Sequence, residues 1–511
     1  MDMSGTRGAS HPPIRFTPGA LFLLVGLVVA SILLHGYHYG FDDQCVYLPA
    51  IKQALDPGLY PADSAFFLGQ SQFGCFVSLV ASTVRLTSCP LPWALLLWHF
   101  GSLLLLLGGC WRILRRSFRT PAGVYGGLLL LTVLLTLPVA GTFLVICDPY
   151  LHTRTLATGL ILFAFADLLD RRLAALVWLL LAGLAHPTLA LLGLCHLAVQ
   201  AWPGRLRTAS SSAVVAAVAV LMISPLAVSG RWLPDPGDSA WRSALAGERY
   251  LFPAQWTWYE LLGAFGPLGI LYLYSRLAGN RGLHDLARIC RRLAISGSLG
   301  VAAGLAIGMV PVLLPLVALE PMRALHLIYL FLALTTGGLA AELLPRSGKM
   351  IAAALLVPLA VAMFLAQRAD LGTNAHIEWP WVTPENDWRR AFEWIRMNTP
   401  RDVLFAMNPD YLLLPGENEH GFRGLAERSQ LADSKKDRAV SRNDPGLAWE
   451  WREEVLAQRG IEDFDENRLA GLRRRFGVAW ILLRKDAGRA ASLPGLACPF
   501  ENRTLRVCRV P

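Results

Sequence analysis

Two adjacent carboxylates, Asp42 and Asp43, follow the first long apolar run of the 511-residue chain. They open a predicted amphipathic helix that ends near Asp56, so one interpretation is that they cap this helix and complement its dipole. The other interpretation is a reactive site, because a carboxylate can act as a general base on an acceptor hydroxyl. The spacing alone leaves both interpretations open.

A second acid, Asp148, lies in another loop, at the end of a long predicted span and just before the next one. Alone it is typical of an ordinary loop aspartate. Two loops that offer carboxylates at the same membrane level can, however, converge on one cavity. An acid and a neighbouring basic group there suit general-base chemistry on an acceptor hydroxyl and the capture of a phosphate.

The elements that must position these residues are membrane helices. Hydrophobic residues make up 54% of the chain and charged residues only 16%, unlike an average soluble protein. From Pro18 to Gln367, apolar runs of roughly 13 to 25 residues match a hydrocarbon core of ~30 Å crossed at 1.5 Å per residue. We therefore predict a polytopic α-helical membrane protein with about eleven transmembrane helices and a C-terminal extracytoplasmic mixed α/β domain.

The charges in the joints set the predicted topology, because Lys and Arg gather on the cytoplasmic side. Basic joints predicted to be cytoplasmic are Arg115 to Arg119, Arg171 and Arg172, Arg205 and Arg207, Arg276 to Arg292, and Arg346 and Lys349. Joints predicted to be outside are 148–153, 186–187 and 319–323, with the arginine-bearing loop 231–258 assigned there by alternation. These joints also account for the net charge of +10, so we expect no nucleic-acid partner.

One segment leaves the count open. Leu91 to Ile113 is a strong span, whereas Gln72 to Leu86 is short and contains Arg85, so we place it on the outer surface; a re-entrant hairpin is the alternative. The predicted divisions are a cytoplasmic N-terminus (1–17), a transmembrane domain (18–367) with a first outer loop (36–90), and an extracytoplasmic domain (368–511). We expect a multi-pass protein of a bacterial inner (plasma) membrane with its C-terminal domain in the periplasm or outside.

The C-terminal region has the patterns of a compact domain. We predict a helix over Trp388 to Asn398, strands over Asp402 to Ala406 and Val478 to Leu483, and a disulfide between Cys498 and Cys508 around a hairpin. A charged stretch from Gly421 to Asp437 is interpreted as a solvated face. If the domain caps a membrane cavity, these charges could instead contact an acceptor or a phosphate.

The order of these features resembles the GT-C superfamily of membrane glycosyltransferases, in particular the protein O-mannosyltransferase and lipid A aminoarabinose transferase types. The matching residues are Asp43-Gln44-Cys45-Val46-Tyr47 at the start of the first outer loop, then surface helices and a span ending in a basic joint, then Asp148-Pro149. Gln44 stands where many members have Glu, which puts metal binding in doubt; Asp42 is a neighbouring carboxylate that could compensate.

The resemblance implies an inverting transfer of a sugar from a polyprenyl-phosphate donor to an extracytoplasmic acceptor, which could be an envelope glycan, a lipid or a protein. Asp43 would be the general base or would orient the acceptor, with Asp42 beside it. Asp148 would position the acceptor or a divalent cation, Mg or Mn, whose requirement stays open. Candidates for contacts to the substrate or to the lipid phosphate are Arg154, Arg323, His326, Tyr47 and His186.

Some of these residues also have plainer interpretations, and so does the whole chain. Arg323 could anchor its helix at the membrane interface, and His186 could be a structural turn residue. A non-catalytic scaffold or a transporter in envelope polysaccharide assembly is the alternative function. Transport is disfavoured because the acids lie near the ends of predicted spans and not at mid-span. The loop 231–258 keeps a polysaccharide polymerase or ligase open as well.

Overall fold

The computed structural model describes residues 16–71, 74–201, 237–382, 386–488, 490, 493 and 495–511. The predicted basic joint at Arg205 and Arg207, residues 231–236 of the predicted outer loop, and residues 1–15 of the predicted cytoplasmic segment lie outside the described residues.

Long apolar helices make this chain a multi-pass membrane protein by helix length and hydropathy. Among the described residues, six segments are long and apolar enough to cross a membrane. They are α1 (Pro18–His35), α5 (Leu91–Ser117), α12 (Trp258–Asn280), α13 (His284–Met309), η4 with α14 (Pro321–Ala324 and Leu325–Leu343), and α15 (Arg346–Asp370). Shorter apolar helices are α4 (Phe76–Thr87), α6 (Pro121–Val133), α8 (Ala174–Ala185) and α9 (Pro187–Ala201), while α7 (Thr153–Leu169) is almost fully buried. The predicted total of about eleven crossings stays a prediction.

The predicted long span ending at Asp148 is wrong. The helix α6 ends at Val133, and the chain then forms a short antiparallel hairpin of β1 (Pro138–Val139) and β2 (Leu144–Val145). Pro138 lacks the amide that a helix needs, and Gly141 turns the chain at a φ of 61°. The run before the 319–323 joint is also interrupted, since α13 ends at Met309 and the 3₁₀ segment η3 (Pro311–Leu319) follows.

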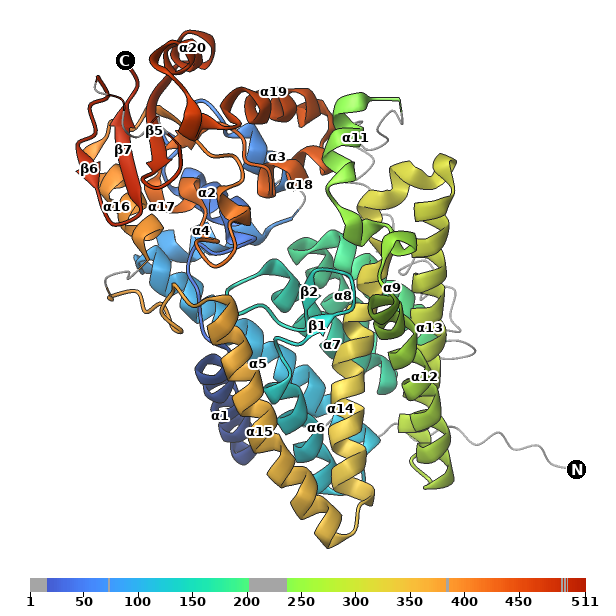
Figure 1. Cartoon of the computed structure of the whole chain (residues 1–511). Helices are drawn as coiled ribbons and strands as arrows, with labels where there is room; N and C mark the ends of the chain where they lie inside the picture. The colour runs from blue at the N-terminus through green and yellow to red at the C-terminus, as the bar shows by residue number, and fades with distance from the viewer. Residues whose placement is uncertain are drawn as a thin grey trace, which may run out of the picture.

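The described basic joints gather at one end of the helices. Arg119, between α5 and α6, donates to the carbonyl of Gly282 in the α12–α13 turn at 2.8 Å. Arg116 forms an ion pair with Asp170 at the α7–α8 joint, and Glu342 at the end of α14 accepts from the Thr120 amide. Figure 1 shows the α12–α13 and α14–α15 turns at the end of the helices remote from the C-terminal sheet. This is the grouping that the alternation of charges predicts.

Glycines allow close packing within this bundle. The helices α6 and α14 approach so closely that a Cβ atom on Gly337 would overlap the carbonyl of Gly126. At the opposite end, the α1–α2 joint meets the segment after α15, where the amide of Tyr37 donates to the carbonyl of His376.

Past α15 the chain folds into a mixed α/β unit that covers this end of the bundle, together with α2 (Gln44–Leu55), α3 (Ala65–Ser71) and α4 (Figure 1). Its five-stranded sheet has the order β4-β3-β5-β7-β6; β3 is parallel to β4 and β5, and β7 is antiparallel to β5 and β6. The strands are β3 (Leu404–Met407), β4 (Ser429–Gln430), β5 (Val478–Arg484), β6 (Phe500–Glu501) and β7 (Leu505–Arg509). The helices are α16 (Asp387–Asn398), α17 (Phe422–Ala426), α18 (Lys436–Asn443), α19 (Ala448–Gln458) and α20 (Glu466–Phe476), with α11 (Ser239–Ala246) packed against α18 and α19.

Four predictions for this region are confirmed. The predicted helix 388–398 is α16, and the two predicted strands are β3 and β5. Cys498 and Cys508 form the predicted disulfide across the β6–β7 hairpin.

Candidate functional site

The loop between α1 and α2 is held by backbone hydrogen bonds to distant parts of the chain. The amide of His38 donates to the carbonyl of Pro149 at 2.9 Å, and the amide of Asp42 donates to the carbonyl of Glu419 at 2.9 Å. Asp42 has a φ of 48°, a left-handed conformation that aspartate tolerates better than most residues. The loop is therefore fixed between the 148–154 joint and the C-terminal unit.

Gln44 stabilises this loop from inside. Its Oε1 accepts from the Gly40 amide at 2.7 Å, and its Nε2 donates to the carbonyl of Leu151 at 3.1 Å. The side chain is buried. A glutamate could accept the first hydrogen bond but could not donate the second when ionised. The departure from the GT-C pattern at this position thus has a structural role in this chain.

Asp43 precedes the first residue of α2, but its carboxylate contacts distant residues instead of the first amides of that helix. Its Oδ2 accepts from Nε2 of His152 at 3.0 Å, and its Oδ1 accepts from Nζ of Lys436 at 2.6 Å. Burial opposes ionisation, but Lys436, His152 and Arg154 together hold the pKa of Asp43 well below its usual range. The capping interpretation is therefore wrong for Asp43.

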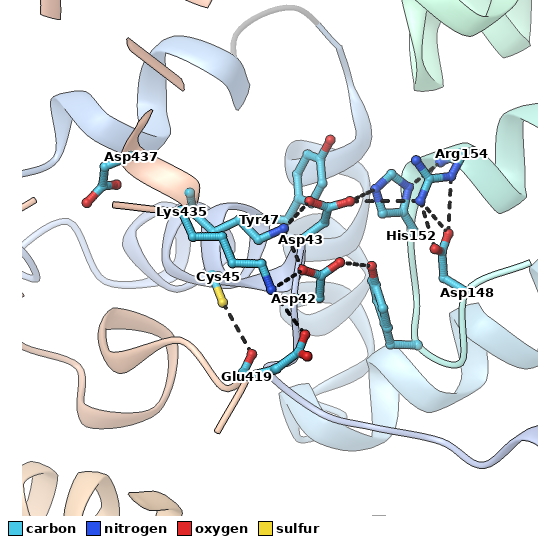
Figure 2. A network of polar contacts seen from close by, with 12 residues as sticks. Asp42, Asp43, Cys45, Tyr47, Asp148, His152, Arg154, Glu419, Lys435 and Asp437 are labelled. Atoms are coloured by element: carbon cyan, nitrogen blue, oxygen red, sulfur yellow. Dashed lines mark hydrogen bonds and ion pairs between the residues drawn. The ribbon is translucent and has the colours of Figure 1, made fainter. Parts of the chain in front are cut away.

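Asp42 shares the same lysine. Its Oδ1 lies 2.6 Å from Nζ of Lys436 and 3.4 Å from Nζ of Lys435, and its Oδ2 accepts from the hydroxyl of Tyr150 at 2.9 Å. Burial raises the pKa of Asp42, but the two ammonium groups outweigh this effect and lower it. Figure 2 shows both carboxylates with Lys435, His152 and Arg154 in one network.

The 148–154 joint supplies the other side of the network. Arg154 holds Asp148 through both carboxylate oxygens, with distances of 2.7 Å from Nη2 to Oδ1 and 3.2 Å from Nε to Oδ2. The Arg154 amide donates to Nδ1 of His152 at 2.8 Å. Because Nδ1 accepts, the proton of the neutral ring lies on Nε2, which is the atom that donates to Asp43.

The C-terminal lysines are held in place by buried acids. Asp433 Oδ1 accepts from the amides of Lys435 and Lys436 at 2.7 and 2.6 Å and so fixes the first turn of α18. Arg423 forms ion pairs with Asp437 and with Asp63, which joins α17 and α18 to the segment before α3.

The interpretation of residues 421–437 as a solvated face is therefore wrong. Arg423, Asp433 and Asp437 are buried. Their charges face partners from the same cluster or from the first loop, and not solvent. The alternative interpretation, in which this unit caps a membrane cavity, agrees with the contacts of Lys435 and Lys436.

A cavity of about 700 Å³ opens beside this network, within the size range of ligand sites. The predicted site residues that line it are Asp42, Asp43, Tyr47, Arg154, His186 and Arg323. Asp148 lies behind Arg154. His326 is fully buried and donates from Nε2 to the carbonyl of Ile146 at 2.8 Å, so the structure does not bring it to the cavity wall. The proposed substrate contact of His326 is thus replaced by a structural one.

Another wall of the cavity centres on Glu320, which pairs with Arg323 and, at 2.8 Å, with Arg442 of α18. The hydroxyl of Tyr250 donates to Glu320 at 3.1 Å. Two guanidinium groups around one carboxylate leave this wall with an excess of positive charge. The anchoring interpretation of Arg323 does not account for its place in the cavity wall.

Sequence reasoning missed Tyr150, His152, Tyr250, Lys435, Lys436 and Arg442 as specific site residues. His152 and Tyr150 lie within the Asp148 motif, and a histidine two residues before the predicted cation was a usable signal. The local sequence holds no signal that pairs Lys436 with Asp43, because these residues are 393 positions apart.

Among the described residues, no group of three or more His, Cys, Asp or Glu side chains has the arrangement of a metal site. The carboxylate oxygens of Asp42, Asp43 and Asp148 are already engaged by ammonium, imidazole, hydroxyl and guanidinium donors. The residues present thus do not fit the divalent cation that the resemblance leaves open.

No protein-family model matches this chain, and no curated protein matches it in sequence. Among solved structures, it is similar to the archaeal oligosaccharyltransferase AglB from Archaeoglobus fulgidus in complex with an inhibitory peptide and a dolichol-phosphate. The TM-score is 0.49 at 13% sequence identity, and the match covers 91% of this chain and 69% of that chain.

Proposed function

We propose that this protein is an inverting membrane glycosyltransferase that moves a sugar from a polyprenyl-phosphate donor to an acceptor hydroxyl. The observation that carries the proposal is the Asp43 carboxylate, one-third exposed and kept ionised, at the wall of a cavity of about 700 Å³. Membrane helices and the C-terminal unit both line this cavity, so a lipid-borne donor and a polar acceptor could enter it together.

In the proposed step, Asp43 accepts a hydrogen bond from the acceptor hydroxyl and takes its proton as the new bond forms. The hydroxyl oxygen attacks C1 of the sugar opposite the phosphate, the bond between C1 and the phosphate oxygen breaks, and the polyprenyl phosphate leaves with the electron pair. Because the pKa of Asp43 is low, it is a weak base toward a free alcohol. Its first task is orientation, and proton transfer comes late, when the attacking oxygen has become acidic.

The departing phosphate needs cations, and the Glu320 wall offers them. Arg323 and Arg442 share one carboxylate, and the side chain of Arg323 is about one-fifth exposed. A phosphate could therefore become a further partner of Arg323, because guanidinium groups form strong charge-assisted hydrogen bonds to phosphate oxygens. His186, whose ring stacks on that of His152, lies in the same cavity wall.

The proposed orientation places the cavity on the extracytoplasmic side of the inner membrane, because the basic joints gather at the opposite end. The envelope glycan, lipid or protein that accepts the sugar would then approach from outside, beneath the C-terminal unit.

The test is sugar transfer from a panel of radiolabelled polyprenyl-phosphate sugars by the purified full chain. Asp43→Asn removes the proton acceptor at nearly constant size, so transfer should fall by about 100-fold or more. Asp56→Asn is the matched control, since the Asp56 side chain is 46% exposed and pairs with the exposed Arg401, and an Asn oxygen can still accept from the Gly58 amide. Full turnover by folded Asp43→Asn would remove Asp43 from the proposed step. No turnover with any donor, and no donor binding, by the wild type would favour the scaffold or transporter alternative.

A further inference from the structure

A single ammonium group lies between the two carboxylates of the proposed site. Nζ of Lys436 is 2.6 Å from Oδ1 of Asp42 and 2.6 Å from Oδ1 of Asp43. Lys436 is 9% exposed, so the ammonium group is largely shielded from water, while about a third of each carboxylate side chain remains accessible. Two carboxylates at this separation repel each other strongly unless a cation lies between them. In this chain the cation is part of the protein.

The remaining oxygens of the pair are also engaged. Oδ2 of Asp42 accepts from Tyr150, and Oδ2 of Asp43 accepts from His152. Divalent cations such as Mg²⁺ prefer oxygen ligands that are free of competing donors. Among the nearby side chains, Asp148 is held by Arg154 through both oxygens, Glu419 accepts from Lys435 at 3.1 Å, and residue 44 is an amide.

The position of Lys436 is built into the fold. Asp433 accepts from the Lys436 amide at 2.6 Å, and Asp437, the next residue, is clamped by Arg423 at 2.8 Å. The lysine backbone is thus fixed on both sides before the side chain extends to the carboxylates. A lysine ammonium has three donors, of which Asp42 and Asp43 take two.

We propose that the Lys436 ammonium is the resident cation of the Asp42–Asp43 pair, in the position that a divalent metal ion would otherwise occupy. The C-terminal unit then completes the site, because its Lys436 ammonium balances the negative charge of Asp42 and Asp43. As a consequence for catalysis, which rests on the proposed function, sugar transfer by this protein needs no divalent cation.

The first test measures Mn²⁺ binding to the purified full chain by electron paramagnetic resonance, which does not depend on activity. The wild type should bind no Mn²⁺ at the pair, whereas Lys436→Gln should gain one site, since the amide oxygen becomes a third ligand beside two carboxylates. The double variant Lys436→Gln with Asp43→Asn should lose that site again. Lys485→Gln is the control for lost charge, because Lys485 pairs with Glu501 at the sheet edge.

The proposal would be overturned if the wild type bound one equivalent of Mn²⁺ and if Asp43→Asn abolished that binding. This outcome can be measured even if Lys436→Gln fails to fold. A folded Lys436→Gln without a new site would also overturn it, because the ammonium would then not occupy a cation position.

The second test measures transfer with and without EDTA. Wild-type transfer should be unchanged by EDTA, and Lys436→Gln should lose about 100-fold, with part of that loss restored by Mn²⁺. Transfer that EDTA abolishes and Mn²⁺ restores in the wild type would overturn the resident-cation proposal while leaving the transferase in place. Absence of transfer under every condition would contradict the proposed function alone, since the Mn²⁺ binding experiment stands apart from it.

Discussion

Arg154 and Asp148 form a bidentate ion pair with 2.7 Å between Nη2 and Oδ1, and both side chains are almost fully buried. The pair lies directly behind Asp43, whose Oδ2 is 3.8 Å from the same Nη2. The arginine thus links the two carboxylates that the sequence places in separate loops.

Replacement of Asp148 by Asn should destabilise the protein strongly. It leaves the Arg154 guanidinium buried with only the more distant Asp43 as a partner, and breaking a buried pair in this way costs about 3 kcal/mol. Thermal unfolding in detergent should show a clear drop in the midpoint relative to the wild type. The exposed pair Arg475–Glu453 provides the control, because Glu453→Gln there should leave the midpoint nearly unchanged. Equal midpoints for both variants would contradict a structural role of the buried pair.

His152→Asn should separate the two tasks of this histidine. The Asn side-chain oxygen can still accept from the Arg154 amide at the start of α7, so stability should remain close to that of the wild type. The shorter side chain cannot reach Asp43, so transfer should fall by about 10- to 100-fold. Steady-state kinetics and thermal unfolding on the same preparation check both parts. If stability and transfer fall together, His152 acts on the fold and not on Asp43.

The response to pH follows from the depressed pKa of Asp43. A carboxylate whose pKa is lower in the folded protein than in the unfolded chain stabilises the fold. This contribution is fully present when the pH is above the ordinary pKa of about 4, and it is lost as the pH falls through the pKa of the folded protein. Protonation of Asp43 should therefore cause no loss of transfer between about pH 5 and 8. In Lys436→Gln the main cation that lowers this pKa is gone, so the acid limb of the pH–rate profile should move to higher pH. An acid limb at the same pH in both proteins would argue against Asp43 as the titrating group.

Gln44→Glu introduces the acid that is common in the motif which the first loop resembles, and we expect it to destabilise this chain. An ionised glutamate cannot donate to the Leu151 carbonyl, and its charge would be buried beside the Gly40 amide. The lost donor alone costs about 1–3 kcal/mol, which thermal unfolding should detect. Unchanged stability together with a new Mn²⁺ site would show that residue 44 faces the cavity and not the loop interior.

The sequence by itself determined the properties that depend on local composition. Apolar length predicts the membrane helices, and the position of Arg and Lys predicts that joints such as those at Arg119 and Gly282 share one end. Asp43 is likewise predicted as a candidate, since an acid beside a membrane helix is costly without a purpose. The short apolar run 478–483 predicts β5, because the preference of such a run for a buried strand depends on a few neighbouring positions.

Only the tertiary structure decided how the site is completed. Lys436 reaches Asp43 across 393 positions, and Gln44 turns inward to Leu151. His326, by contrast, is bound to a backbone carbonyl away from the cavity wall. Local patterns do not encode these outcomes, because they depend on which surfaces meet when the C-terminal unit packs on the α1–α2 loop. Before that packing, water competes for the charged side chains. Once the packing has excluded water, a buried charge must be paired with the oppositely charged group beside it.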